Sequence, residues 1–74
     1  MVKIYYATAE SRNFSFEAIG KTYNEAIGML HKGLKAHAKQ YNLEPKWFEE
    51  WADIRVEELE FGKVYRDRSE MKEV

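Results

Sequence analysis

The sequence predicts an α+β protein in which one long helix covers a three-stranded, mainly antiparallel sheet. Apolar side chains alternate with others along residues 2–9 and 14–18, which is typical of the two strands of a hairpin. They recur at helical spacing along residues 22–41. They alternate again along residues 54–61, so that the predicted order is strand, strand, helix, short helix, strand.

The predicted hairpin turns at the polar run Glu10–Asn13. Ile4 and Tyr6 share one face of the first strand, and Phe14 and Phe16 share one face of the second. A hairpin alone is marginal in water, so its apolar face needs a cover. We therefore expect the helix to pack on the sheet face that carries these four residues. The last strand should lie beside the first, because the helix returns the chain to that edge.

The long helix is expected to begin at Thr22 and to end near Tyr41. Thr22 is a suitable N-cap, and Glu25 is placed to complete a capping box. Asn42 suits a left-handed cap, and Pro45 prevents direct continuation. At about 100° per residue, one arc of this helix is apolar and should face the sheet. Its members are Tyr23, Ala26, Ile27, Leu30, Leu34, His37, Ala38 and Tyr41.

Two glycines interrupt the helix at positions 28 and 33. Each costs the helix about 1 kcal/mol relative to alanine. Gly28 is expected to face solvent, where the cost is simply tolerated. Gly33 borders the apolar arc, where tolerance and close approach by another backbone are equally good explanations.

A short second helix should follow, opened by Pro45. Trp47, Phe48 and Trp51 share one side of it, and we expect them to cap one end of the core. In the final strand, strict alternation puts Leu59 on the face opposite Ile54 and Val56. A β-bulge at Glu57–Glu58 would restore a single apolar face, so a bulge is predicted there.

Composition indicates one small domain, residues 1–65, followed by a charged tail, residues 66–74. The chain has no cysteine, which excludes a disulfide framework and thiol catalysis. No run of about 18 apolar residues is present, so a membrane contact is not expected. We expect a cytoplasmic protein.

Charge is unevenly distributed, although the net charge is only -1. Residues 21–41 hold four lysines and one acid, whereas residues 44–60 hold seven acids and two basic residues. The near-neutral total argues against a general nucleic-acid binder, whose affinity needs a strongly basic surface. The acidic half favours a basic partner.

No constellation for catalysis, a metal or a cofactor is found in the sequence. His31 and His37 are six residues apart, so they do not form the i, i+4 pair that chelates a metal on a helix. No serine lies in a nucleophile elbow and no glycine-rich loop matches a phosphate cradle. We therefore expect no enzyme, and His37 is interpreted as a partly buried histidine near a helix C-terminus.

Two family resemblances cover about the first half of the chain. Ile4-Tyr5-Tyr6, followed by Ala18-Ile19-Gly20-Lys21-Thr22 and a helix ending near His37, resembles the start of the GIY-YIG nuclease family. That family places two tyrosines on a hairpin and an arginine on the next helix. Here Ala18 stands at the second motif tyrosine and the helix has no arginine. Gly20-Lys21-Thr22 with Glu25-Ala26 also resembles the strand-to-helix junction of HicB-type antitoxins and related small bacterial and phage domains.

These observations favour a non-enzymatic interaction module of bacterial or phage type, acting as an inhibitor or adaptor. The predicted contact surface consists of an aromatic segment and acids: Trp47, Trp51, Glu49, Glu50, Asp53, Glu57 and Glu58. A homodimer is one form of this contact, because we expect Trp47 and Trp51 not to be both buried, with Met29 and Gly33 nearby. The alternative is a nucleic-acid-associated domain that uses the helix face Lys32, Lys35 and Lys39.

Overall fold

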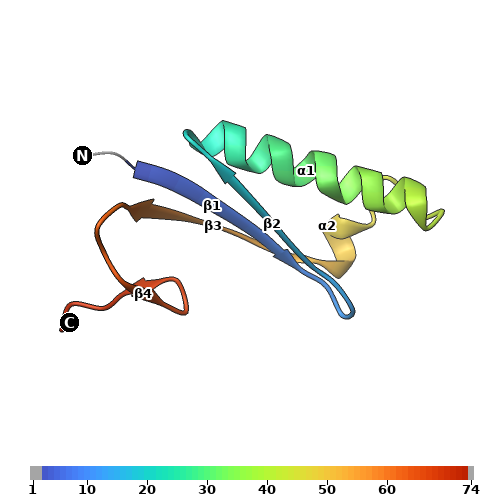
Figure 1. The fold of residues 1–74 in the computed structure, drawn as a ribbon. Helices are drawn as coiled ribbons and strands as arrows, with labels where there is room; N and C mark the ends of the chain where they lie inside the picture. Colours follow the sequence, from blue (N-terminus) through green and yellow to red (C-terminus); the bar gives the residue numbers. More distant parts are fainter. Residues whose placement is uncertain (1–2, 74) are drawn as a thin grey trace.

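The computed structural model describes residues 3–73, and it is a mixed α+β fold (Figure 1). The elements in chain order are β1 Lys3–Glu10, β2 Ser15–Gly20, α1 Tyr23–Gln40, α2 Phe48–Trp51, β3 Asp53–Glu60, β4 Tyr65–Arg66 and β5 Ser69–Glu70. The predicted fold class and the order of its main elements are confirmed. Val2, which the sequence assigns to the first strand, lies outside the described residues.

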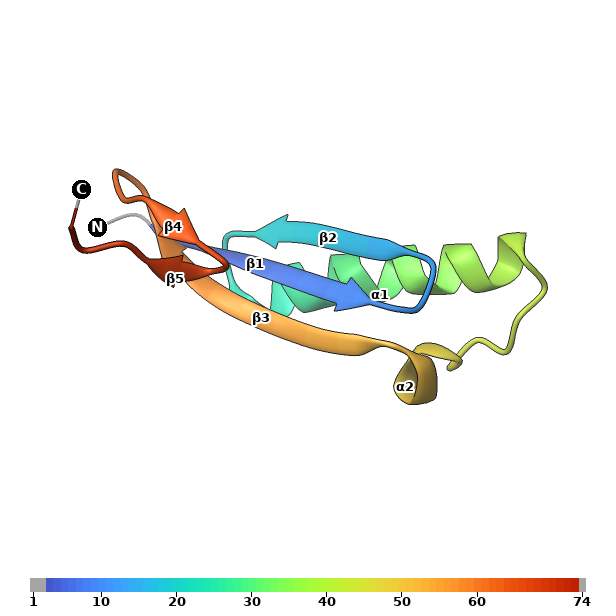
Figure 2. The ribbon, with the colours of Figure 1, turned by 90° about the horizontal axis from the view of Figure 1, so that it is seen from below.

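The main sheet has the strand order β2-β1-β3, and both pairs are antiparallel (Figure 2). The placement of the last strand beside the first is therefore confirmed. The predicted β-bulge is wrong, because β1 and β3 pair residue for residue from Lys3–Glu60 to Glu10–Asp53. The regular pairing leaves Leu59 opposite Ile4, so that β3 carries apolar side chains on both faces.

Helix α1 has the ends that its sequence predicts. The Thr22 hydroxyl accepts from the Glu25 amide at 3.1 Å, and the Glu25 carboxylate accepts from the Lys21 amide at 2.8 Å. At the other end Asn42 has a positive φ of 57°, and the Leu43 amide donates to the Ala38 carbonyl at 2.7 Å. Both helix ends therefore satisfy backbone groups that would otherwise lack partners.

The helix covers the opposite face of β1 from the one expected. Ala7 and Ala9 are fully buried against Leu30 and Leu34, whereas the alternation of β1 places Ile4 and Tyr6 on the other side of the sheet. Phe16 does pack against the core, as predicted, but Phe14, which directly precedes the first residue of β2, is 43% exposed. The expectation for Ile4 and Tyr6 is wrong because methyl side chains on β1 let the helix sit close to the sheet, and larger residues fill the space beside them. Those residues include Phe16, Phe48, Ile54 and Val56.

A small hairpin, β4–β5, lies beneath the sheet on the side away from α1 (Figure 1). Arg68 in its turn forms ion pairs of 3.9 Å with Glu10 and with Glu57. The Tyr65 hydroxyl accepts from the Glu60 amide at 2.9 Å. The sequence did not predict this hairpin, since each of its strands has only two residues.

Candidate functional site

An aromatic cluster surrounds His37 at the end of the molecule where α1 finishes. The His37 ring lies 4.6 Å from Phe14, 5.1 Å from Phe16, 4.6 Å from Tyr41 and 5.2 Å from Trp47, measured between ring centroids. These residues come from the β1–β2 turn, from β2, from the end of α1 and from the approach to α2. We call this group, together with Leu43 and Trp51, the aromatic end.

Much of the aromatic end is exposed. Trp51 is 68% exposed, and Tyr41, Phe14 and Leu43 are between 43% and 52% exposed. Trp47 is half-buried, and its indole Nε1 donates to the Leu34 carbonyl at 3.2 Å. The prediction that the two tryptophans are not both buried is therefore confirmed. Phe48, which was expected to share their side of the segment, is buried in the core instead.

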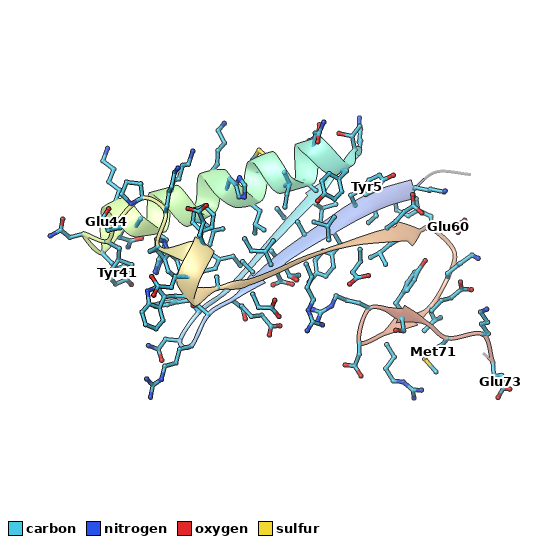
Figure 3. The ribbon with its side chains drawn as sticks, turned by 180° about the vertical axis from the view of Figure 1, so that it is seen from behind. Tyr5, Tyr41, Glu44, Glu60, Met71 and Glu73 are labelled. Carbon is cyan, nitrogen blue, oxygen red and sulfur yellow. The ribbon has the colours of Figure 1, made fainter. Side chains whose placement is uncertain are left out.

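Two adjoining hollows lie at the aromatic end, and Leu43, Trp47 and Trp51 line both. The first, of about 180 Å³, is completed by Ser11, Arg12, Asn13, Phe14 and His37. The second, of about 440 Å³, is completed by Glu44, Lys46 and Glu50. Figure 3 shows Tyr41 and Glu44 together at this end of the molecule, far from Glu60, Met71 and Glu73 at the other. The exposed Trp51 is therefore shared by two hollows, one with Arg12 at its rim and one with Glu44, Lys46 and Glu50 at its rim.

The five predicted acidic residues do not form one surface. Glu57 and Glu58 are consecutive in β3, so they lie on opposite faces of the sheet. Glu57 pairs with Arg68, Glu58 with Lys3 at 3.6 Å, and Asp53 with Arg55 at 3.3 Å. Of the five, only Glu49 and Glu50 have no ion pair within residues 3–73, and both lie in α2 beside Trp51.

The three predicted lysines are brought together. Lys32, Lys35 and Lys39 are exposed on α1, on the side turned away from the buried residues Leu30 and Leu34. None of the three forms an ion pair in the part of the chain that the structure describes. Between Ala26 and Gln40 the helix contains no acid.

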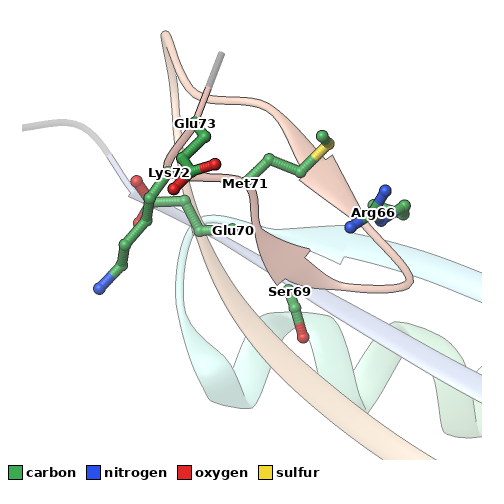
Figure 4. A pocket seen from close by; sticks show the side chains of 6 residues that line it. All are labelled: Arg66, Ser69, Glu70, Met71, Lys72 and Glu73. Atoms are coloured by element: carbon green, nitrogen blue, oxygen red, sulfur yellow. The ribbon is translucent and has the colours of Figure 1, made fainter.

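A more spacious hollow than these two, of about 550 Å³, belongs to the C-terminal hairpin rather than to the aromatic end. It is lined by Arg66, Ser69, Glu70, Met71, Lys72 and Glu73. Figure 4 shows that the Arg66 and Lys72 side chains point to opposite sides of it, so the charged groups do not converge on one point. This hollow lacks the convergent polar groups that mark a binding pocket.

Two tyrosines of β1 donate to carboxylates. The Tyr5 hydroxyl donates to Glu58 at 2.9 Å, and the Tyr6 hydroxyl donates to Glu17. These hydrogen bonds favour the protonated phenol, so they raise the pKa of both Tyr5 and Tyr6 above the ordinary value of 10.0. In the described residues, no three metal-ligating side chains cluster closely enough to hold a metal ion.

No family model, curated protein or solved structure matches this chain. The resemblances to GIY-YIG nucleases and to HicB-type antitoxins therefore stay predictions. Within residues 3–73, no helix has both the length and the apolar character that crossing a bilayer requires.

Sequence reasoning identified Trp47 and Trp51 but missed the residues that surround them. The sequence pattern predicts Phe14 in the core, whereas Phe14 is 43% exposed at this surface. Arg12 was read as a turn residue, although the turn carries it to the rim of the same hollow. The missed signal is the length of α1: it starts against Gly20, and its 18 residues carry His37 to Phe16 and Phe14, level with the β1–β2 turn.

Proposed function

We propose that this chain is a protein-binding module, an inhibitor or adaptor, that holds a basic segment of its partner at the aromatic end. The observation that carries the proposal is the exposure of Trp51 at 68%, in a hollow that it shares with Trp47 and Phe14. Tryptophan and tyrosine are enriched at the centres of protein interfaces, where their large surfaces lose contact with water. A surface of this kind is stabilised by a partner that covers it.

The chemistry of the surface favours a cationic side chain in the partner. An arginine or lysine over the face of an indole gains cation–π energy, and tryptophan is the best of the aromatic acceptors. Glu44 and Glu50 lie at the rim of the larger hollow, and Glu49 precedes Glu50 in α2. Arg12 and Lys46 also lie on the rims, so the three acids leave this end with a small negative excess.

The test is a tryptophan-fluorescence titration of the full chain with an oligo-arginine peptide that contains no aromatic residue. Binding should quench the exposed Trp51 indole of the wild type. In Trp51→Ala, Trp47 still lines both hollows and reports binding, and the affinity should be weaker by about 2 kcal/mol or more, as expected for a central interface residue. High salt should weaken binding as well, because the screening length falls to about 8 Å at physiological ionic strength.

Phe61→Ala is the matched control, because Phe61 is 63% exposed but follows β3 at the far end of the sheet. It should leave the affinity unchanged. An oligo-glutamate peptide that binds as well as oligo-arginine would contradict the proposal, as would equal losses in the two variants.

The alternative function, nucleic-acid association, rests on the exposed set Lys32, Lys35 and Lys39, which forms no ion pair with the described residues 3–73. Tyr41, 52% exposed at the end of the same helix, could stack on a base. A gel shift with single-stranded DNA and RNA tests this alternative. Tight binding that is abolished by the triple change of these lysines to glutamate, together with no binding of oligo-arginine, would favour it over the protein-binding proposal.

A further inference from the structure

Strand β2 is an unprotected sheet edge. It lies at one side of the sheet, so one row of its backbone groups has no strand partner within residues 3–73 (Figure 2). Monomeric proteins usually protect such edges with charges, bulges or proline. The other edge, β3, carries charges throughout: Asp53, Arg55, Glu57, Glu58 and Glu60. In contrast, β2 pairs regularly with β1, has no proline, and has Glu17 as its single charged residue.

The flank of α1 above this edge is uncharged. Two contacts orient the helix over β2: Ala26 lies against Gly20, and His37 lies against Phe16. Ala26 and His37 define a line along the helix, and the buried Leu30 and Leu34 lie on one side of it. At about 100° per residue, the positions on the other side of that line project beyond the outer edge of β2. They are Met29, Gly33, Ala36 and Gln40, all exposed. Their spacing of four, three and four residues is that of a helix–helix seam.

Gly33 lies near the centre of this arrangement. Because Ala26 lies over one end of β2 and His37 over the other, the middle of the helix lies over Ala18. A side-chain carbon added at Gly33 would meet nothing within 4 Å. The isolated chain therefore gives no packing reason for a glycine that weakens the helix. Close approach by a second helix would supply one.

We infer that two copies of this chain pair antiparallel through β2, about a two-fold axis at Ala18. Three strands from each copy then form one continuous six-stranded sheet. Glu17 of one copy lies opposite Ile19 of the other, and Phe16 lies opposite Gly20. A register centred on Glu17 would place two carboxylates face to face, which disfavours it.

The helices fit the same axis. Helix α1 packs mainly over β2 and β1, so the two helix axes lie roughly two strand spacings, about 10 Å, apart. That distance is within the range of packed helices, and the small side chains of Gly33 and Ala36 allow close contact. The two aromatic ends point away from each other and stay free. The dimer is therefore independent of the proposed binding of a basic partner.

Sedimentation equilibrium of the full chain tests the inference. The expected mass is twice 8.8 kDa, with dissociation on dilution. Gly33→Glu should weaken the dimer by roughly a factor of ten or more, because it puts two carboxylates at the helix seam. Gly28→Glu is the matched control: a side chain at Gly28 also meets nothing within 4 Å, but position 28 lies on a different side of α1. Circular dichroism should show that both variants stay folded.

A second pair of variants tests the register. Ile19 is 62% exposed on the free sheet face, so a charge there is tolerated by the single chain. Ile19→Glu should weaken the dimer because it faces Glu17 of the other copy, whereas Ile19→Lys should not. A wild-type chain that stays monomeric at high concentration would overturn the inference. So would a dimer that Gly33→Glu and Gly28→Glu affect equally, or assembly into larger oligomers.

Discussion

At the scale of single residues, Gly20 marks a close approach between the sheet and the helix. A side-chain carbon at this position would lie 2.4 Å from the Ala26 amide nitrogen and 2.9 Å from its Cα. Both are backbone atoms near the start of α1, so they cannot rotate away as a flexible side chain would. Gly20→Ala should therefore destabilise the fold by about 3 kcal/mol or more, at the upper end of overpacking costs.

Urea unfolding followed by circular dichroism measures this effect. Gly28→Ala serves as the comparison, because Gly28 has open space and lies inside the helix. It should gain up to about 1 kcal/mol from better helix propensity. If the two variants are equally stable, the close approach of β2 to α1 is not tight in solution.

Residue-scale features that depend on near neighbours could be predicted from the sequence. The Thr22 cap, the Glu25 partner and the left-handed Asn42 each involve groups within a few positions of one another. The surroundings of His37 could not be predicted in the same way. Phe14 reaches it only because the β1–β2 turn, Trp47 and the end of α1 meet in space, which no local pattern encodes.

At the scale of elements, the orientation of β1 is the finding that the sequence pattern misses. Both faces of β1 carry apolar residues, so alternation alone does not decide which face the helix covers. Leu34 is fully buried over Ala7 and Ala9, and Leu34→Ala should cost about 2–5 kcal/mol. Ile4 lies on the other face and is half-buried, so Ile4→Ala should cost about 1 kcal/mol or less.

Thermal or urea unfolding of the two variants decides the point. A larger loss for Ile4→Ala than for Leu34→Ala would mean that the helix covers the other face.

The two consecutive acids Glu57 and Glu58 of β3 show a second point that sequence reasoning missed. Consecutive strand residues always point to opposite faces, so the separation of Glu57 from Glu58 was available from the sequence. The incorrectly predicted β-bulge at Glu57–Glu58 is the reason why this separation was not predicted.

At the scale of the whole molecule, the hydrogen bonds of two phenols and the ammonium group of Lys63 make the stability decrease at alkaline pH. Hydrogen bonding to Glu58 and to Glu17 raises the pKa of Tyr5 and Tyr6, and hydrogen bonding to Glu70 raises the pKa of Lys63. A group whose pKa is raised by folding stabilises the native state at pH values below its pKa in the unfolded chain. This stabilisation is lost as the pH rises through its pKa in the folded chain. The unfolding free energy should therefore fall above about pH 10.

The double variant Tyr5→Phe/Tyr6→Phe should show a shallower fall, because it removes both phenols and leaves Lys63. Urea titrations between neutral pH and pH 11 measure the slope. Parallel curves for the wild type and the double variant would show that neither hydrogen bond contributes in solution. Adding Lys63→Gln to this double variant should make the remaining decrease of the unfolding free energy with pH shallower still.

The central strand of the sheet, β1, precedes both of its partner strands in the sequence, and this order restricts the route of folding. β1 can pair early with β2 across a short turn, but its other edge waits for β3, whose pairing joins Lys3 to Glu60. Contacts so far apart in sequence are formed slowly, because the entropy of closing the loop is lost before they form. During synthesis, the hairpin and α1 precede β3, so the edge of β1 that pairs with β3 stays unpaired until β3 has emerged.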